Sequence, residues 1–454
     1  MRKTVVLDVV GLSTSVIGRH TPFLQQYVQQ HHLATVKPML PAVTTAVQST
    51  YVTGKWPAEH GIVGNGWYDR EDCEVKFWKQ SNKLVQSEKI WEKARRLQPD
   101  FTCAKMFWWY NMYSTADYSV TPRPQYLSDG RKMPDCYAHP ASLRDHLQKE
   151  LGQFPLFQFW GPGANIKSTQ WIADASQVTD NLYDPTLTLI YLPHLDYCLQ
   201  KFGPDESKIS KELQEIDNVC KQLVTFYEKK GAQVILLSEY GINPVNNPVH
   251  LNRILRQEGL LQIREERGLE LLDPGASKAF AVADHQIAHI YINDLASAKK
   301  VRNIIENVPG VAQVLDREGK RKHQLHHERA GDYILVADND SWFTYYYWLD
   351  DNKAPDFARI VDIHRKPGYD PVEMFLNPAD PLVKAKIVGK LLKKKMGFRY
   401  LMDVIPLDAT LIKGSHGALP ADSAYHPVLI TPQALSKEQL VATDVYDVIW
   451  NTMQ

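Results

Sequence analysis

Short apolar runs alternate with amphipathic segments along most of the chain. Three runs, over residues 3–8, 186–192 and 233–238, are rich in β-branched residues and leucine. Runs of this length without polar alternation are typical of strands that are buried on both faces of a parallel sheet. Between them, apolar residues recur every three or four positions, which predicts helices. The pattern therefore predicts an α/β sheet that is covered by helices on both faces.

The same patterns predict the remaining elements. Residues 114–140 are rich in Pro, Tyr and Asp and indicate an excursion rather than core. We expect a single domain over residues 1–454, with an excursion within 110–180 and a cap inserted at 340–410. Helices are predicted over 24–31, 141–152, 211–230, 249–271, 296–307 and 384–395, and strands over 103–110, 288–292, 333–337 and 427–431.

Composition narrows the functional classes. The 454 residues are 44% apolar and 23% charged, and the 52 basic residues equal the 52 acidic ones. Such a balance argues against a nucleic-acid coat and against a membrane-surface protein. The five cysteines are odd in number and lack a CxxC spacing, which indicates reduced thiols. Asp8 interrupts the apolar run at the N-terminus, and no apolar stretch is long enough to span a bilayer. We expect a soluble cytoplasmic protein.

The stretch from Pro41 to Asn65, PAVTTAVQSTYVTGKWPAEHGIVGN, carries the first candidate chemistry. Pro41 indicates a turn, and Thr44 or Thr45 can cap the helix that follows. A hydroxyl group at a helix N-terminus lies at the positive end of the helix dipole, beside free N–H groups that favour anions. A threonine there becomes a nucleophile when a divalent metal removes its proton. A plain helix cap is the alternative interpretation.

Acidic residues and a glycine-flanked histidine supply candidate metal ligands. Asp8, Asp196 and Glu239 each follow one of the three buried strands, and His416 lies in the sequence GSHG. Ligands of open α/β sheets bind at the carboxyl ends of the strands, where these acids would meet. Each acid alone could cap a helix, but together they would be crowded unless cations neutralise them. Carboxylates with imidazole are suitable ligands for Zn or Mn.

The segment from Pro41 to Asn65 resembles the nucleophile segment of the nucleotide pyrophosphatase/phosphodiesterase branch of the alkaline phosphatase superfamily. The resemblance rests on a threonine before a helix, then V-T-G-x-x-P-x-x-H-G-I-V-x-N. It implies an alkaline-phosphatase-like α/β/α sandwich with a mostly parallel central sheet and an inserted cap. It also implies that Thr44 is the nucleophile, with Thr45 as the alternative, and that Asn65 holds a phosphoryl oxygen together with backbone N–H groups.

The resemblance further implies two divalent metal ions, Zn or alternatively Mn. Asp8 and Thr44 match two ligands of one ion. The family's Asp-His pair for the same ion corresponds here to Glu239 and Tyr240. Glutamate can ligate on a longer arm, whereas tyrosine binds such metals only when it is ionised.

The ligands that the resemblance implies for the other ion are also altered. Asp196 matches the first residue of an Asp-x-x-x-His motif, because Gly203-Pro204 closes it as in the family, and His416 matches the late histidine. Gln200 stands at the motif's histidine position, and it is a weak neutral ligand. We favour His285 as the replacement ligand; an ordinary surface histidine at a strand start is the alternative.

The loop HRKPGYDP supplies the candidate substrate contacts His364, Arg365 and Tyr369, since loops above a scaffold often carry them. The resemblance implies a metal-dependent hydrolase of phosphodiester or pyrophosphate bonds in a small phosphorylated molecule. Two alternatives remain open. One is a phosphonate or other ester hydrolase, or a phosphomutase, of the same superfamily. The other is a degenerate member that binds a phosphorylated metabolite without hydrolysis. The oligomeric state is left open.

Overall fold

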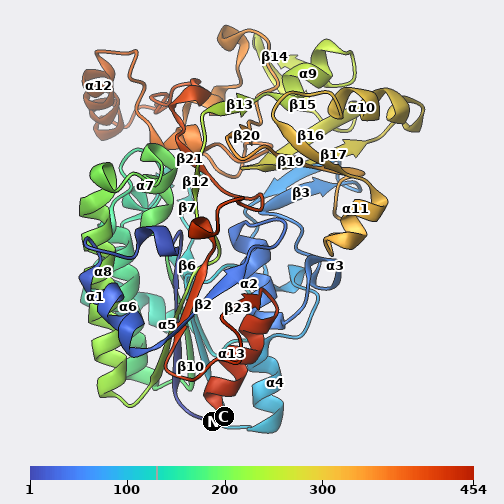
Figure 1. Ribbon diagram of the computed structural model, residues 1–454. Helices are drawn as coiled ribbons and strands as arrows, with labels where there is room; N and C mark the ends of the chain where they lie inside the picture. The colour runs from blue at the N-terminus through green and yellow to red at the C-terminus, as the bar shows by residue number, and fades with distance from the viewer. Residues whose placement is uncertain (129–130) are drawn as a thin grey trace.

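A mostly parallel central sheet organises the molecule (Figure 1). The computed structural model describes residues 1–128 and 131–454, and within these ranges the sheet has nine strands. They are β1 (Thr4–Val9), β2 (His32–Lys37), β5 (Cys103–Met106), β6 (Tyr118–Pro122), β9 (Cys136–His139), β10 (Leu187–Leu192), β11 (Gln233–Leu237), β22 (Val428–Thr431) and β23 (Gln439–Val441). Their order is β23-β2-β22-β11-β1-β10-β5-β6-β9. Only β22 and β9 run antiparallel to their neighbours.

Helices cover both faces of this sheet, so the predicted sandwich is confirmed. Successive β1 side chains point to opposite faces, as in any strand. Val6 packs in one core cluster, whereas Val5 and Leu7 pack in the other. The helices on the Val5 face are α1 (Pro22–Gln30), α5 (Ala141–Leu151), α6 (Ile166–Tyr183), α7 (His194–Phe202) and α8 (Glu206–Lys229), and those on the Val6 face are α2 (Thr44–Thr53), α4 (Ile90–Leu97) and α13 (Asp444–Met453).

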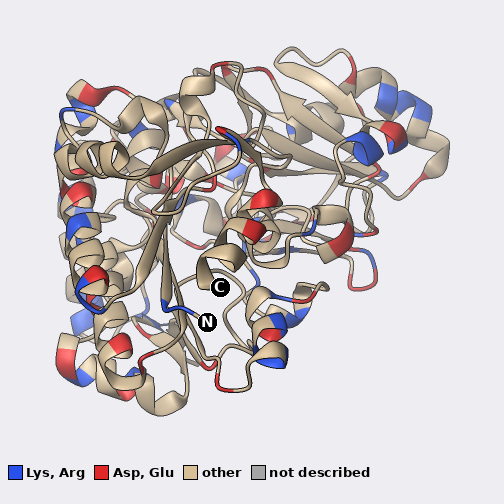
Figure 2. Ribbon diagram, turned by 60° about the horizontal axis from the view of Figure 1, so that its bottom comes forward, with Lys and Arg blue, Asp and Glu red and all other residues tan. Residues whose placement is uncertain are grey.

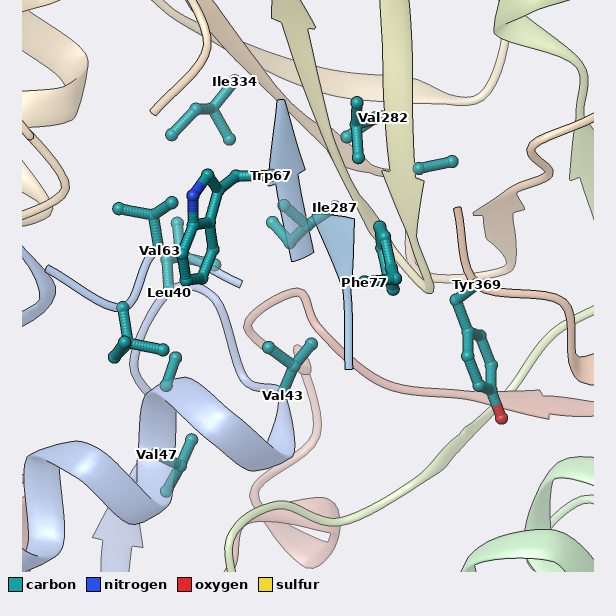
Figure 3. Packing of buried hydrophobic residues seen from close by; sticks show 14 of the residues in the cluster. Leu40, Val43, Val47, Val63, Trp67, Phe77, Val282, Ile287, Ile334 and Tyr369 are labelled. Atoms are coloured by element: carbon teal, nitrogen blue, oxygen red, sulfur yellow. The ribbon is translucent and has the colours of Figure 1, made fainter. Parts of the chain in front are cut away.

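A second, antiparallel sheet packs beside the N-terminus of α2 and closes one side of the site. Val43 and Val47 of the α2 segment face Ile287 and Val282 of this sheet across a continuous apolar cluster (Figure 3). Its strands, in the order β16-β17-β19-β18, are β16 (Ala279–Asp284), β17 (Ile287–Ile292), β19 (Tyr333–Ala337) and β18 (Val311–Leu315), and α9 (Leu251–Gln257), α10 (Ala298–Ile305) and α11 (Arg317–Lys322) lie beside it.

Short helices and two-stranded ribbons complete the fold around the two sheets. Helix α3 (Pro57–His60) follows α2, and helix α12 (Val383–Lys395) stands on the surface. The two-stranded ribbons pair β3 (Gly66–Asp69) with β4 (Glu74–Phe77), β7 (Gln125–Tyr126) with β8 (Lys132–Met133), β12 (Asn243–Pro244) with β21 (Gly414–Ser415), β13 (Asn247–Val249) with β20 (Ser341–Phe343), and β14 (Gln262–Glu266) with β15 (Leu269–Asp273).

The prediction of one helix over residues 249–271 is wrong. Helix α9 ends before Gly259, which adopts a positive φ of 73° that favours glycine. The residues that follow form the hairpin β14–β15, which turns at Arg267-Gly268. The first strand of this hairpin is mostly exposed, and in the second strand, LELLD, buried positions alternate with less buried ones. This two-residue period is that of a strand and not of a helix.

Two further expectations need correction. Asp284 and His285 do not open a strand: Asp284 ends β16, and His285 occupies the turn to β17 with a φ of 59°. Residues 114–140 are not excluded from the core either, because β6 and β9 extend the central sheet. Tyr, Thr and Val in that stretch pair at the sheet edge despite the neighbouring prolines.

No helix in the described part of the chain is long and apolar enough to cross a membrane. The five cysteines are free thiols, as their spacing predicted.

Candidate active site

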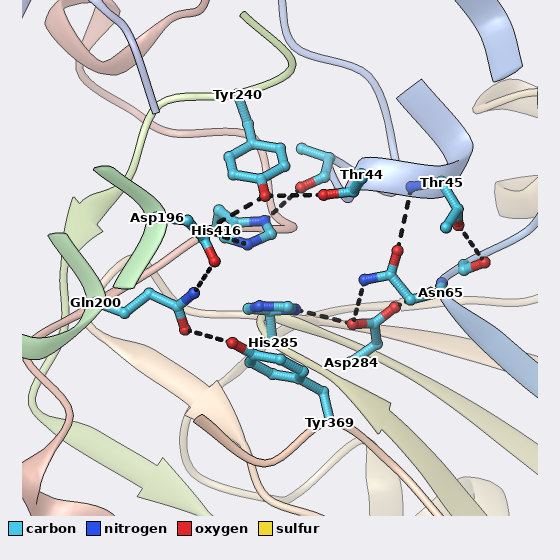
Figure 4. A network of polar contacts seen from close by, with 12 residues as sticks. Thr44, Thr45, Asn65, Asp196, Gln200, Tyr240, Asp284, His285, Tyr369 and His416 are labelled. Carbon is cyan, nitrogen blue, oxygen red and sulfur yellow. Dashed lines mark hydrogen bonds and ion pairs between the residues drawn. The ribbon is translucent and has the colours of Figure 1, made fainter. Parts of the chain in front are cut away.

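Thr44 is the first residue of α2 and lies beside a cavity of about 500 Å³. Val43 occupies the cap position, so the expectation that Thr44 or Thr45 caps the helix is wrong. The Thr44 hydroxyl lies 3.0 Å from the Tyr240 hydroxyl (Figure 4). The Thr45 hydroxyl instead donates to the carbonyl oxygen of Gly64 at 2.8 Å. Of the two threonines, Thr44 therefore presents its oxygen to the cavity.

Asn65 fixes the start of α2. Its side-chain oxygen accepts a hydrogen bond from the backbone N–H of Thr45 at 3.1 Å, and its amide nitrogen donates to Asp284 at 3.1 Å. The backbone N–H of Asn65 donates to the other Asp284 oxygen at 2.9 Å. Asp284 is thus an anchor that sequence reasoning treated only as the neighbour of His285.

The carboxylate half of the site consists of Asp8, Glu239 and Gln48. One amide nitrogen of Gln48 donates to Asp8 at 3.0 Å and to Glu239 at 2.5 Å, while its oxygen accepts from the backbone N–H of Trp109. Burial raises the pKa of Asp8 to about 7, and burial together with the adjacent Asp8 charge raises the pKa of Glu239. Sequence reasoning missed Gln48, although it lies one helical turn after Thr44.

The imidazole half consists of Asp196, Gln200, Tyr240, His285 and His416. Asp196 lies in the first turn of α7, and Gln200 follows one turn later and donates to it at 2.9 Å. The Tyr240 hydroxyl lies 3.4 Å from the other Asp196 oxygen. Burial raises the pKa of Asp196 to about 7. Tyr240 therefore bridges Thr44 and Asp196.

The two histidines present unpaired nitrogens to this half. His416 donates from Nδ1 to the carbonyl oxygen of Ala42 at 2.7 Å, which leaves Nε2 facing Asp196 at 3.8 Å. His285 contacts Asp284 through Nδ1 at 2.8 Å, and the two imidazole rings lie 3.8 Å apart. Burial lowers the pKa of both imidazoles, so they are neutral near pH 7. Neutral imidazoles oriented through Nδ1 are suited to bind a metal through Nε2.

Glycines hold His416 in place. Gly417 has a φ of 114°, and a side chain at Gly414 would collide with the carbonyl oxygen of Leu199. The backbone of His416 accepts a hydrogen bond from Gln286, and that of Gly417 accepts one from Ala42. The glycines of GSHG thus allow this segment to pass between α7 and the second sheet in close contact with both.

Of the three residues proposed in the loop 364–371, only Tyr369 lines the cavity. Tyr369 donates to Gln200 at 3.1 Å and stacks on His285 at 3.7 Å between ring centroids. Arg365 instead pairs with Asp356 at 3.3 Å, and His364 lies outside the cavity lining among the described residues. Aromatic side chains form part of the remaining wall, together with charged and polar ones; the aromatic residues are Trp78, Trp109, Phe159, Trp160, Tyr191 and Tyr197.

The carboxylate and imidazole groups of the site are chemically suited to bind divalent ions. They are fewer than the resemblance implies, because Gln200 and Tyr240 stand at two of the histidine positions. Within the two halves of the site, four buried atoms that could bind a metal have no hydrogen-bond partner among the described residues: Asp8 Oδ1, Glu239 Oε2, His285 Nε2 and His416 Nε2. Buried carboxylates of raised pKa are the kind of group that a cation stabilises in its charged form. In the part of the chain that is described, however, no three His, Cys, Asp or Glu side chains form a ready metal-binding group.

The sequence model of the type I phosphodiesterase / nucleotide pyrophosphatase family matches residues 4–370. The chain belongs to this family. A Schizosaccharomyces pombe protein described as an uncharacterized pyrophosphatase/phosphodiesterase is 26% identical over 274 residues, which are 57% of this chain and 48% of that protein. Ectonucleotide pyrophosphatase/phosphodiesterase 2 of Saccharomyces cerevisiae is 23% identical, over 54% of this chain and 48% of that protein. The chain thus spans about half the length of these curated relatives.

Solved structures share the family fold. One is an inactive variant of murine ectonucleotide pyrophosphatase/phosphodiesterase 5 in complex with AMP, with a TM-score of 0.62 at 14% identity. The match covers 100% of this chain and 95% of that chain. Phosphonoacetate hydrolase from Sinorhizobium meliloti, in complex with phosphonoformate, has a TM-score of 0.62 at 13% identity; the match covers 100% of this chain and 96% of that chain. At these identities the likeness confirms the alkaline-phosphatase-like fold alone.

Proposed function

We propose that this family member hydrolyses a phosphodiester or pyrophosphate bond in a small molecule and uses Thr44 as the nucleophile. The observation that carries the proposal is the position of the Thr44 hydroxyl. It lies at a helix start, faces the cavity, and contacts Tyr240 between the two halves of the site. Family membership and the complexes of the structural neighbours with AMP and phosphonoformate support a phosphorylated ligand.

The chain's own residues suggest how the Thr44 proton leaves. Thr44 Oγ1 attacks phosphorus, the bond from phosphorus to the leaving oxygen breaks, and a phosphothreonine ester forms. The Tyr240 hydroxyl contacts both Thr44 and Asp196, so it can pass the threonine proton to the Asp196 carboxylate. Water then hydrolyses the ester and frees Thr44.

Two divalent ions, Zn or Mn, are part of the proposal. Asp8, Glu239 and Thr44 would hold one ion, and Asp196 and His416 would hold the other with His285 as the third ligand. When bound, such ions lower the pKa of a coordinated hydroxyl and neutralise charge on phosphoryl oxygens. Asn65 would act by keeping the helix start in place, because both ends of its amide are already hydrogen-bonded within the protein.

The test is turnover by the metal-reconstituted protein. Bis(p-nitrophenyl) phosphate, p-nitrophenyl thymidine 5′-phosphate and phosphonoacetate would be assayed side by side. Hydrolysis of a diester, with an adduct on the Thr44 peptide in acid-quenched samples by mass spectrometry, is the expected result. Cleavage of phosphonoacetate alone would move the assignment to phosphonate hydrolysis.

The non-hydrolytic alternative retains one specific observation in its favour. Gln200 and Tyr240 stand where the family carries histidines, and both already donate hydrogen bonds to Asp196. Micromolar phosphate binding by calorimetry without turnover of any of the three substrates would establish this alternative and contradict our proposal.

A further inference from the structure

Helix α12 lies at the periphery of the protein (Figure 1), and none of its residues is buried. Its inner face is anchored by Val383 and Ile387, which pack against the main core cluster. The helix is therefore attached along one side and leaves its opposite side to the surroundings.

The outer side of α12 carries an apolar ridge. Val388, Leu392 and Met396 follow one another at four-residue spacing and are 57%, 54% and 64% exposed. Leu391, 47% exposed, lies one helical turn from Val388, and Phe398, just beyond the helix, is 64% exposed. Exposed apolar residues are ordinary when they are scattered, but a contiguous ridge marks a surface that binds something.

Basic residues flank this ridge. The segment 381–402 contains six lysines and one arginine and no acidic residue. Lys386 pairs with Asp380 and Lys390 with Asp403 at its base. Among the described residues, no carboxylate pairs with Lys384, Lys393, Lys394, Lys395 or Arg399. Over most of the ribbon, by contrast, acidic and basic residues are interspersed (Figure 2).

We propose that α12 docks this protein on an anionic lipid surface. A helix with an apolar face and flanking lysines lies in the plane of a bilayer, with the apolar side chains in the acyl boundary and the lysines at anionic headgroups. The cationic flanks would repel a second copy of the same helix, so self-association is disfavoured. The balanced charge of the whole chain argued against a membrane-surface role, but a net charge of zero does not show that basic residues are concentrated in residues 381–402.

The position of α12 relates the docking surface to the candidate site. Met374 lines the cavity, and the adjacent Phe375 lies under the ammonium group of Lys201 at 5.1 Å. The chain continues from there into α12 within ten residues. A docked helix would hold this wall of the cavity near the lipid surface.

Co-sedimentation of the full-length protein with vesicles tests the proposal. Vesicles of phosphatidylcholine alone are compared with vesicles that contain 30% phosphatidylglycerol, at low and at high salt. We expect binding to the anionic vesicles at least ten-fold stronger than to the neutral ones, and loss of most of that difference in 0.5 M salt. Lys393→Gln, Lys394→Gln and Lys395→Gln together should weaken binding roughly 100-fold.

A second variant separates the apolar contribution. Val388→Ser, Leu392→Ser and Met396→Ser together should weaken binding at least ten-fold, because the apolar ridge no longer enters the bilayer. The matched control is Leu295→Ser with Lys299→Gln, which removes an exposed apolar and a basic residue far from α12 and should change nothing. Failure of the wild type to bind anionic vesicles, or binding of both α12 variants as strong as that of the wild type, would overturn the proposal. Concentration-dependent self-association that the α12 variants abolish would instead assign the ridge to a protein interface.

Discussion

The two halves of the site differ in how many hydrogen bonds their buried carboxylates receive. In the carboxylate half, Asp8 and Glu239 share a single amide group of Gln48 and each keeps one oxygen without a partner. In the imidazole half, Asp196 receives hydrogen bonds from Gln200 and Tyr240. The first half therefore retains a demand for a cation, whereas the second half satisfies its one carboxylate largely with neutral donors. The comparison teaches that a buried carboxylate keeps its demand for a cation where neutral hydrogen-bond donors are too few.

The largest expected effect is that of Thr44→Val, which keeps the side-chain shape and removes the nucleophile. The proposal predicts a loss of kcat/KM of at least 1,000-fold, since no other hydroxyl takes its place. Thr45→Val is the matched control. It removes the hydrogen bond to Gly64 and should lower stability by about 1 kcal/mol while turnover stays within ten-fold. Equal losses in both variants would remove the distinction between the two threonines.

The next effect concerns the carboxylate half. Asp8→Asn with Glu239→Gln removes two negative charges without a change in volume, so the ion that they would hold should be lost. Metal analysis should show a stoichiometry lower by about one ion per chain, and turnover should fall about 100-fold or more. An unchanged metal content would mean that these two carboxylates hold no ion.

A gain of binding should follow when the imidazole half is restored to the family pattern. Gln200→His supplies an imidazole ligand beside Asp196 and His416, so the ion that they would hold should bind roughly 10–100-fold more tightly. Competition with a metal-sensitive dye measures this affinity. Gln222→His is the control and should leave the affinity unchanged, because Gln222 contacts Gln170 and Asp174 of α6 and lies outside the cavity lining.

The smallest effect is a pH dependence of stability in the metal-free protein. Burial raises the pKa of Asp196 from 3.8 to about 7, so the folded state holds this proton more tightly than the unfolded state does. The resulting stabilisation is complete below pH 4 and is lost as the pH rises toward 7. Between pH 5.5 and pH 8, urea unfolding of the wild type in chelator should lose on the order of 2 kcal/mol more than that of Asp196→Asn. Parallel pH profiles would assign the proton elsewhere.

Much of the fold could be predicted because the central strands are uninterrupted apolar runs. Those runs place Asp8, Asp196 and Glu239 at one edge of the sheet, and the GSHG sequence brings His416 to the same place. Strand β16 of the second sheet and the separate hairpin β14–β15 were not predicted, because the sequence pattern there is ambiguous between helix and strand.

The contacts within the site were harder to predict than its location. Gln48 and Asp284 act through partners that are distant in sequence, and nothing in the local pattern marks those partners. The loop that carries Tyr369 to Gln200 also contains the buried Lys366, which pairs with Asp370 and Glu373. Arg365 was predicted to contact the substrate, but it pairs with Asp356 instead.

The metal content of the purified, reconstituted protein tests the account most directly, because it needs no knowledge of the substrate. Mass spectrometry should give close to two Zn or Mn ions per chain in the wild type. One ion per chain would contradict the assignment of a second ion to the imidazole half. No bound ion after reconstitution would contradict the central claim that the site around Thr44 works with divalent metals.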